Sequence, residues 1–421
     1  MACFEHGGVE CTIGPASFVS TAAVTEWGHA RSLEDTYAWV KPLLRRVPIT
    51  RVADATPLDS LGLPVWCAVT PLAKDLTVHA GKGATARAAE LSAIMEAIER
   101  VCAESVPADR TRKASYADLC AERGPAALDP ETLNLPFETA YAPERPIRWT
   151  LGYDVAQREH LWVPLDAVIS PAQEGVCHGV ETNGLAAGNT VTEAAMHALY
   201  ELVERDASSG EQFVELFADA ADQHAPRVRM VDIAQLGDDA RAWIDRLLAN
   251  ELRVAVQELT SDIGVPVFGA FIIDEAFPGN PGRTTTFSGH GCDSSARRAV
   301  FRALTEATQA HSVVLLGARD TFEGTRPLPD RGARLRRRLD VLHAWRHVAF
   351  RDDDLGSGDL WQDMQTVLER LSAVGLRRCV VVDLTRADVG VPVVRVIVPG
   401  LEHPYAFSAR RPGPRLLRRL L

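Results

Sequence analysis

The alternation of apolar and polar residues divides this chain into segments of two kinds. Short runs rich in β-branched or aromatic residues, bounded by glycine or proline, predict strands. Such runs cover residues 63–71, 148–155, 160–163, 253–258, 265–273, 379–383 and 391–398. Longer runs with apolar residues three and four apart predict amphipathic helices. One short helix is expected after Ser32, and others are expected over residues 85–104, 191–208, 242–249 and 294–311.

Three of these helices follow a strand and a glycine-bearing turn, and their sequences echo one another. Residues 83–100 align with residues 188–205 at an offset of 105, with seven identities in 18 positions. The same offset continues into the third helix. The aligned positions are Glu96, Glu201 and Glu306, and three residues further on Glu99, Glu204 and Gln309. A repeat of this kind predicts three equivalent strand-and-helix units.

Carboxylates gather on one face of the first two helices. The polar face of the first helix holds Ser92, Glu96 and Glu99, and its opposite face holds Leu91, Ile94, Met95 and Ile98. The polar face of the second helix holds Glu193, Glu201 and Glu204. Like charges at this spacing destabilise a helix by a few tenths of a kcal/mol per pair, so a compensating cation is expected. Five carboxylates brought together would suit Mg²⁺, which takes carboxylate oxygens and keeps waters and substrate phosphates.

A less specific interpretation applies to each glutamate alone. A solvated acidic face is common because glutamate favours helices and is usually exposed. Glu193 also fits a capping box that begins at Thr190. Neither explanation accounts for the same Glu-x-x-Glu-Arg ending two helices after the same kind of turn. In a phosphate site, Arg100 and Arg205 would hold phosphate oxygens or pair with the glutamates.

Composition and charge narrow the class of protein. The 421 residues are 46% hydrophobic and 24% charged, which is typical of a globular protein with a large core. The formal net charge of −11 argues against nucleic-acid binding over the whole surface. No apolar run approaches the roughly 20 residues of a membrane helix, and the N-terminus lacks the pattern of a signal peptide. We therefore expect a cytoplasmic protein with mostly reduced cysteines, since its eight cysteines form no CxxC pair.

One glycine-rich segment has part of the pattern of a nucleotide-binding P-loop. Gly81-Lys82-Gly83 is not a P-loop, because that motif needs Ser or Thr after the lysine and another glycine where Leu76 stands. Nucleotide binding, if present, therefore uses another architecture.

The two glutamate helices make the chain resemble the YcaO family of ATP-dependent enzymes, which activate peptide backbone amides. The family's first motif, Ser-x3-Glu-x2-Glu-Arg, is matched by Ser92, Glu96, Glu99 and Arg100. Its second motif, Asn-x3-Glu-x7-Glu-x2-Glu-Arg, is matched by Asn189, Glu193, Glu201, Glu204 and Arg205. Residues 302–309 are similar to its third helix, and residues 394–402 are similar to a strand and turn near the end of its domain.

The resemblance implies an ATP site that contains Mg²⁺. The implied Mg²⁺ ligands are Glu96, Glu99, Glu193, Glu201 and Glu204. The implied ATP contacts are Arg31, Thr36, Lys82, Ser92, Asn189, Arg205, Arg302 and Gln309. Among these, Arg31 and Thr36 correspond to a basic residue and a hydroxyl that the family supplies from an N-terminal helix. The arginine usual two residues after the third-helix glutamine is His311 here, and no catalytic residue is assigned.

The resemblance also narrows the reaction. Residues 49–59 and 63–65 look like the branch associated with TfuA proteins, whose products are peptide thioamides. Residues 411–421 lack the Pro-x-Pro-x-Pro terminus of azoline-forming members. The implied reaction is phosphorylation of a backbone amide by ATP, with external sulfide as the nucleophile. Two alternatives stay open: a cyclodehydratase that forms azolines from Cys, Ser or Thr, and a non-catalytic protein that binds Mg-nucleotide and peptide.

The expected architecture follows from the same resemblance. The fold is expected to be α+β and YcaO-like, with three pseudo-equivalent strand-and-helix units around one nucleotide site and a C-terminal strand pair. Residues 1–60 should contribute to that site, residues 61–400 should form the catalytic core, and residues 401–421 a basic tail. The Arg-rich stretch 326–351 is expected to be an exposed insertion or a docking site for an acidic leader or partner. A precursor peptide and a separate TfuA-like or leader-binding protein are the expected partners, without nucleic acid or membrane. The oligomeric state stays open, a homodimer included.

Overall fold

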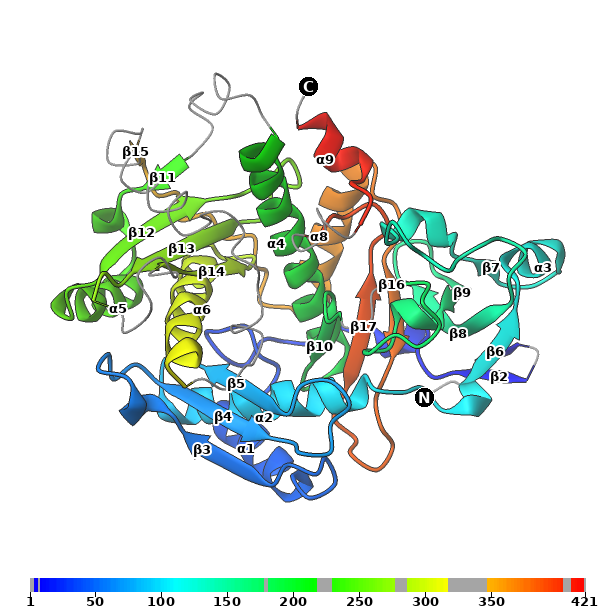
Figure 1. Ribbon diagram of the computed structural model, residues 1–421, viewed down its shortest axis with the longest axis horizontal. Helices are drawn as coiled ribbons and strands as arrows, with labels where there is room; N and C mark the ends of the chain where they lie inside the picture. The colour runs from blue at the N-terminus through cyan, green and yellow to red at the C-terminus, as the bar shows by residue number, and fades with distance from the viewer. Residues whose placement is uncertain are drawn as a thin grey trace.

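The computed structural model describes residues 4–6, 8–177, 181–217, 229–276, 286–316, 347–403 and 410–419. These residues form three main sheets with three long helices between them (Figure 1). In the view of Figure 1 the five-stranded sheet lies at the left, the seven-stranded sheet at the right and the three-stranded sheet at the bottom. The predicted α+β class is therefore confirmed.

The sheets are mainly antiparallel. The three-stranded sheet has the order β3 (Arg51–Asp54), β4 (Val65–Val69) and β5 (Val78–Lys82). The seven-stranded sheet has the order β10 (Leu185–Ala187), β17 (Val393–Ile397), β16 (Val380–Asp383), β8 (Ile147–Asp154), β9 (Glu159–Pro164) and β7 (Ala126–Ala127), with β6 (Thr111–Ala114) paired to β8. The five-stranded sheet has the order β14 (Thr286–Cys292), β13 (Val267–Ile273), β12 (Arg253–Glu258), β11 (Arg229–Val231) and β15 (His347–Val348). A separate ribbon pairs β1 (Phe4–His6) with β2 (Val9–Cys11).

The five predicted helices are present with shifted ends. The long ones are α2 (Ala86–Cys102), α4 (Val191–Phe217) and α6 (Ala296–Leu316). The other two are α1 (Leu33–Val40) and α5 (Asp238–Ala249), whereas α3 (Tyr116–Ala121), α8 (Leu360–Ala373) and α9 (Pro414–Arg418) were not predicted. Side-chain caps start several of them; in α1 Ser32 accepts a hydrogen bond from Asp35 N, and in α2 Thr85 accepts one from Ala88 N.

Helix α2 separates its two faces as the sequence predicts. Leu91, Ile94 and Ile98 are buried, whereas Glu96 lies on the half-buried opposite face. Burying each large aliphatic side chain contributes on the order of 2 kcal/mol, which fixes the rotation of the helix about its axis. The carboxylate face is thereby turned away from the apolar core.

The glycines before α2 and α6 have a different role from the one predicted. Gly81 lies in β5 and Gly289 in β14, so the predicted glycine turns are strand residues at these positions. A Cβ at Gly81 would lie 2.1 Å from Ala93 N of α2, and one at Gly289 would lie 2.2 Å from Ala307 N of α6. Glycine is needed because each helix packs directly on the backbone of its own strand.

Helix α4 continues well beyond the predicted end near Ser208. Serine and glycine usually weaken helices, but the hydroxyl groups of Ser208 and Ser209 donate to the carbonyl of Arg205 and stay within the helix. Gly210 leaves room for the side chain of Arg419, whose Nε would lie 2.2 Å from a Cβ at this position. The end of the chain therefore packs against α4.

The remaining predictions concern the C-terminal part. The expected strand pair is present as β16 and β17, and both strands belong to the seven-stranded sheet. The basic tail includes α9, in which Arg415 contacts Asp206 of α4 at 2.8 Å. Residues 326–346 of the Arg-rich stretch lie outside the described residues. Of the seven described cysteines none is in a disulfide, and five are buried.

Candidate active site

The three long helices and their strands are arranged in a cycle. Helix α2 packs on its own strand β5 and beside β10, α4 packs on β10 and beside β14, and α6 packs on β14 and beside β5. Aligned side chains make the links: Glu99 accepts a hydrogen bond from Ala187 N at 3.2 Å, and Gln309 donates one to Ala80 O at 2.6 Å. Each unit thus supports the next, and the polar faces of the three helices converge.

The carboxylates at the centre of this cycle are held by arginines of their own helices. Arg100 contacts Glu96 at 3.0 Å, and Arg205 contacts the equivalent Glu201 at 3.5 Å. Both contacts join residues four apart, which are neighbours on a helix surface. Arg100 also contacts Asp75 at 2.9 Å. The two arginines therefore pair with glutamates in this structure, one of the two roles that their spacing allows.

The third helix departs from this pattern. Ala310 stands where α2 and α4 have their arginine, so Glu306 has no such partner within α6. Instead Lys82 Nζ, from strand β5, donates to Glu306 Oε2 at 2.5 Å. Lys82 was predicted to contact ATP, and the structure places it at the cluster, paired with a carboxylate that the predicted set of ligands omitted.

Burial and mutual repulsion perturb these carboxylates. Burial, then Glu96 and Glu201, raise the pKa of Glu99 well above its ordinary value. Burial and Glu306 raise the pKa of Glu204 to about 7. Burial also acts on Glu306, but Lys82 and Arg205 outweigh it and lower its pKa to about 2. Within this pair the negative charge therefore favours Glu306, and Glu204 is the member that is more readily protonated.

Two half-buried histidines border the cluster, and neither was among the predicted site residues. His197 Nε2 lies 2.6 Å from Arg302 Nη2, and these residues occupy aligned positions of α4 and α6. Burial and Arg302 lower the pKa of His197, so its neutral ring accepts the hydrogen bond. Burial lowers the pKa of His290 to about 4. The sequence held a signal for this pair, because the offset of 105 leads from Ser92 to His197 and again from His197 to Arg302.

Glu193 lies apart from the other predicted ligands, near the start of α4. Its carboxylate accepts a hydrogen bond from Ala30 N at 2.9 Å and lies 3.1 Å from His29 Nδ1 and 3.0 Å from Asn189 Nδ2. The backbone N–H of Glu193 donates a hydrogen bond to Thr190 Oγ1, which caps the start of α4. Only half of the capping box is formed, because the carboxylate turns to the N-terminal segment instead.

The same contacts bring the N-terminal segment to α4. Thr36 Oγ1 lies 2.8 Å from Asn189 Oδ1, so two predicted ATP contacts meet here. Arg31 stacks on Trp39, with its guanidinium carbon 4.3 Å from the ring centre. Ser92 lies half-buried on α2, one turn before Glu96. The predicted nucleotide residues therefore run from this segment to the glutamate cluster.

Arg395 of β17 adds a positive charge that the sequence did not reveal. It is 2% exposed and donates to the carbonyl groups of Val168, Asn183 and Glu181. Burial lowers its pKa, while Glu181, Glu201 and Glu99 oppose that shift. Arg395 therefore supports the carboxylates electrostatically, although its hydrogen bonds are made to the backbone.

The residue chemistry fits Mg²⁺, although no finished cage is present. Among the described residues, no group of three or more His, Cys, Asp or Glu side chains is arranged to hold a metal ion. Mg²⁺ commonly takes one or two carboxylates and completes its shell with waters and phosphates, so it needs no cage of protein groups alone. Glu204 and Glu99 have raised pKa values, as expected for carboxylates that lack a matching cation.

Comparisons with known proteins agree with this geometry. A family model described as "YcaO cyclodehydratase, ATP-ad Mg2+-binding" matches residues 80–402. An uncharacterized protein in the tfuA 3′ region of Rhizobium leguminosarum bv. trifolii is 34% identical over 409 residues, which are 91% of each chain.

Solved structures show the same architecture. YcaO from Methanopyrus kandleri, bound with AMPPCP and Mg²⁺, is 25% identical with a TM-score of 0.71, over 94% of this chain and 99% of that one. A heterocyclase in complex with substrate and cofactor is 21% identical with a TM-score of 0.74, over 93% of this chain. The match covers 55% of the heterocyclase, and at this identity it shows the fold alone. No helix among the described residues is long and apolar enough to span a membrane.

Proposed function

This chain belongs to the YcaO family, and we propose that it uses ATP and Mg²⁺ to convert a backbone amide of a ribosomally made peptide into a thioamide. The observation that carries the proposal is the cycle of three helices, which brings Glu96, Glu99, Glu201, Glu204 and Glu306 to one centre bordered by Lys82, Arg100 and Arg205. Carboxylates and cations in such proximity suit a metal-bound triphosphate.

The proposed reaction overcomes the poor leaving ability of an amide oxygen. Sulfide adds to the carbonyl carbon, and the oxygen of the resulting adduct takes the γ-phosphoryl group of ATP, which leaves ADP. The C–O bond then breaks, phosphate departs with the former amide oxygen, and loss of the sulfur proton leaves a C=S bond. Mg²⁺, when bound, would offset the charge on the phosphates.

The protein's own residues would bind and orient the nucleotide. Glu99 and Glu204, whose pKa values are raised by burial and by neighbouring carboxylates, would face the metal in their ionised form, and Glu96 and Glu201 would complete the acidic wall. Lys82, Arg100 and Arg205 neutralise the carboxylates before the nucleotide binds, and each can shift to a phosphate oxygen afterwards. Thr36 and Asn189, in mutual contact, would hold the nucleoside end together with Arg31. Glu193 would fix the N-terminal segment against α4 and stays a predicted ligand.

Sulfide as the nucleophile is the finer part of the proposal. The relative from the tfuA 3′ region supports it, together with residues 49–59 of the chain itself. A separate TfuA-like protein would then deliver sulfide or present the precursor peptide. The family description as a cyclodehydratase favours the alternative, in which a neighbouring Cys, Ser or Thr attacks and an azoline forms.

Substrate design separates the two reactions. The test incubates the protein with candidate precursor peptides that carry no Cys, Ser or Thr beside the target amide, together with ATP, Mg²⁺ and a sulfide source. Intramolecular cyclisation then has no nucleophile, whereas sulfide can still react. We expect mass spectrometry to show exchange of one oxygen for one sulfur. Loss of one water that depends strictly on a neighbouring Cys would instead establish the azoline reaction.

A further inference from the structure

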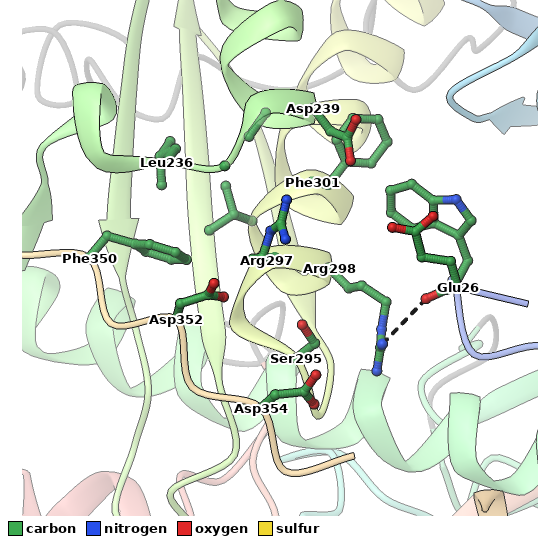
Figure 2. A pocket seen from close by; sticks show the side chains of 14 residues that line it. Glu26, Leu236, Asp239, Ser295, Arg297, Arg298, Phe301, Phe350, Asp352 and Asp354 are labelled. Carbon is green, nitrogen blue, oxygen red and sulfur yellow. Dashed lines mark hydrogen bonds between the residues drawn. The ribbon is translucent and has the colours of Figure 1, made fainter. Parts of the chain in front are cut away.

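A pocket of about 240 Å³ lies beside the N-terminal half of α6 and includes none of the glutamates of the candidate active site. Four segments form it: residues 26–27, the start of α5, the start of α6, and residues 350–354 (Figure 2). Its volume is below the roughly 300–1,000 Å³ typical of small-molecule sites, so it suits one large side chain better than a whole cofactor.

Aromatic rings form the pocket wall and are fixed by their neighbours. The ring centres of Trp27 and Phe301 are 4.9 Å apart, and Phe301 packs edge-on against Trp243 at 5.3 Å. On the opposite side Phe350 packs against Phe268 at 5.9 Å. Trp27 is still 36% exposed. The pocket therefore offers an indole surface to solvent that is already held in place.

The charges that line the pocket are unbalanced. Glu26, Asp239, Asp352 and Asp354 contribute carboxylates, and Arg297 and Arg298 contribute guanidinium groups. Arg298 is matched outside the pocket, because its guanidinium lies 2.7 Å from Asp293. Within the part of the chain that the structure describes, no ion pair joins Arg297 to any of the four carboxylates. The four carboxylates thus face one unmatched cation.

The segment that carries Asp352 and Asp354 is held in place by residues at the start of α6. Ala296 N donates to Asp353 O at 2.8 Å, and Leu355 N donates to Ser294 O at 2.9 Å. Asp354 also accepts a hydrogen bond from Gly356 N at 2.8 Å. The backbone that carries Asp352 and Asp354 therefore requires little ordering on binding, which reduces the entropic cost of association.

A fixed aromatic wall with excess carboxylate is the chemistry that recognises an organic cation. A guanidinium stacks on an indole face and donates to carboxylates through its planar edge. We propose that this pocket binds an arginine side chain of the peptide substrate. The proposal rests on the proposed function for the identity of the peptide, whereas the preference for a guanidinium follows from the lining residues.

The N-terminal segment that contains Glu26 and Trp27 connects the pocket to the predicted nucleotide-binding residues. The backbone carbonyl of Glu26 accepts a hydrogen bond from Arg298 Nη1 at 3.4 Å (Figure 2). Two residues after Trp27, His29 contacts Glu193 at 3.1 Å. A peptide anchored at the pocket would thus lie along the same segment that contributes to the candidate active site.

The test uses the full chain with 5-fluorotryptophan and follows ¹⁹F NMR signals, with the Trp27 resonance assigned by its loss in Trp27→Phe. The probe is N-acetyl-arginine amide, and the matched neutral probe is N-acetyl-citrulline amide. We expect a saturable shift of the Trp27 signal with the arginine probe and none with citrulline. The comparison of the two probes is made on the chain with its native pocket residues, and Trp27→Phe serves only to assign the signal.

Two variants complete the test. Asp352→Asn should weaken binding of the arginine probe about threefold, as expected for loss of one exposed ion pair, and the exposed control Glu369→Gln on α8 should leave it unchanged. An equal response to citrulline, a response to N-acetyl-glutamate amide, or equal binding by both variants would overturn the proposal. Calorimetry of Mg²⁺ and AMPPCP with the same protein tests the nucleotide site separately, so failure of either proposal is distinguishable.

Discussion

His311 Nδ1 lies 2.9 Å from Asp59 Oδ2, and this buried contact joins α6 to the segment before β4. The other ring nitrogen, Nε2, lies 3.0 Å from Asp274 Oδ2 at the end of β13. His311 stands where the resemblance led us to expect an arginine, and it contacts two carboxylates as an arginine would. The residue therefore joins three segments of the fold.

The His311 contacts predict a pH-dependent stability. Burial alone would lower the pKa of His311, but the hydrogen bonds to Asp59 and Asp274 outweigh it and raise that pKa. The imidazolium therefore stabilises the fold fully below its unfolded pKa of about 6.5, and this contribution is lost as pH rises through the folded pKa. Burial would raise the pKa of Asp59, but the contacts of its carboxylate outweigh burial and lower that pKa. The stability that the Asp59 carboxylate contributes is therefore lost as pH falls through its folded pKa.

The measurement is chemical denaturation near neutral and at alkaline pH. His311→Leu should lower the free energy of unfolding by about 3 kcal/mol near pH 6, because buried Asp59 and half-buried Asp274 lose their cation. The difference between wild type and variant should shrink as pH rises. A difference that is constant with pH would show that His311 acts only through packing.

Replacing a carboxylate of the acidic centre should affect the free energy of unfolding and the activity in different ways. Glu99→Gln and Glu204→Gln remove carboxylates whose pKa values are raised by burial and by like charges, so the free energy of unfolding should stay the same or increase. Affinity for AMPPCP with Mg²⁺ should fall at least on the order of tenfold, since even outer-shell changes cost that much at metal sites. Turnover should be lost.

Calorimetry and thermal unfolding check this prediction together. Glu369→Gln on the exposed face of α8 is the matched control, because it makes the same chemical change at an exposed position outside the three helices of the cycle. Unchanged nucleotide affinity and turnover in both active-site variants would falsify the assignment of these carboxylates.

The contact between Lys82 and Glu306 predicts an energetic coupling between the first and third units. Lys82→Met should raise the pKa of Glu306, because Lys82 is the main cation that opposes its burial. In a double-mutant cycle with Glu306→Gln, the two changes should be non-additive by about 1 kcal/mol in the free energy of unfolding. Additive effects would mean that the lysine serves the nucleotide alone.

The C-terminal helix gives a prediction about stability. Arg415 contacts Asp206 at 2.8 Å, and Asp206 is 2% exposed and directly follows Arg205. Arg415→Met leaves this carboxylate buried without its partner, which should cost about 3 kcal/mol. Arg411→Met, at an exposed position of the same tail, is the control and should change stability by under about 0.5 kcal/mol. Denaturation of both variants tests whether the tail is anchored as described.

Several features were determined by the sequence alone, because they depend on local spacing. The helix α2 and the three-fold repeat were predicted from the periodicity and the internal echo, the YcaO family was predicted from the resemblance of the two glutamate motifs, and all three are confirmed. Helix periodicity places residues three and four apart on one face in any fold. The pairing of Arg100 with Glu96 was likewise one of the roles that this spacing allows.

The tertiary structure alone decided which faces meet. The sequence placed Glu193 with the other glutamates, whereas packing turns it to His29 and the N-terminal segment. Glu306 joins the centre only because α6 packs beside β5, which brings Lys82 across 224 positions of the chain. The aromatic pocket beside α6 likewise unites four distant segments. Periodicity specifies which side of a helix is polar, but the partner of that side depends on long-range packing that no local pattern encodes.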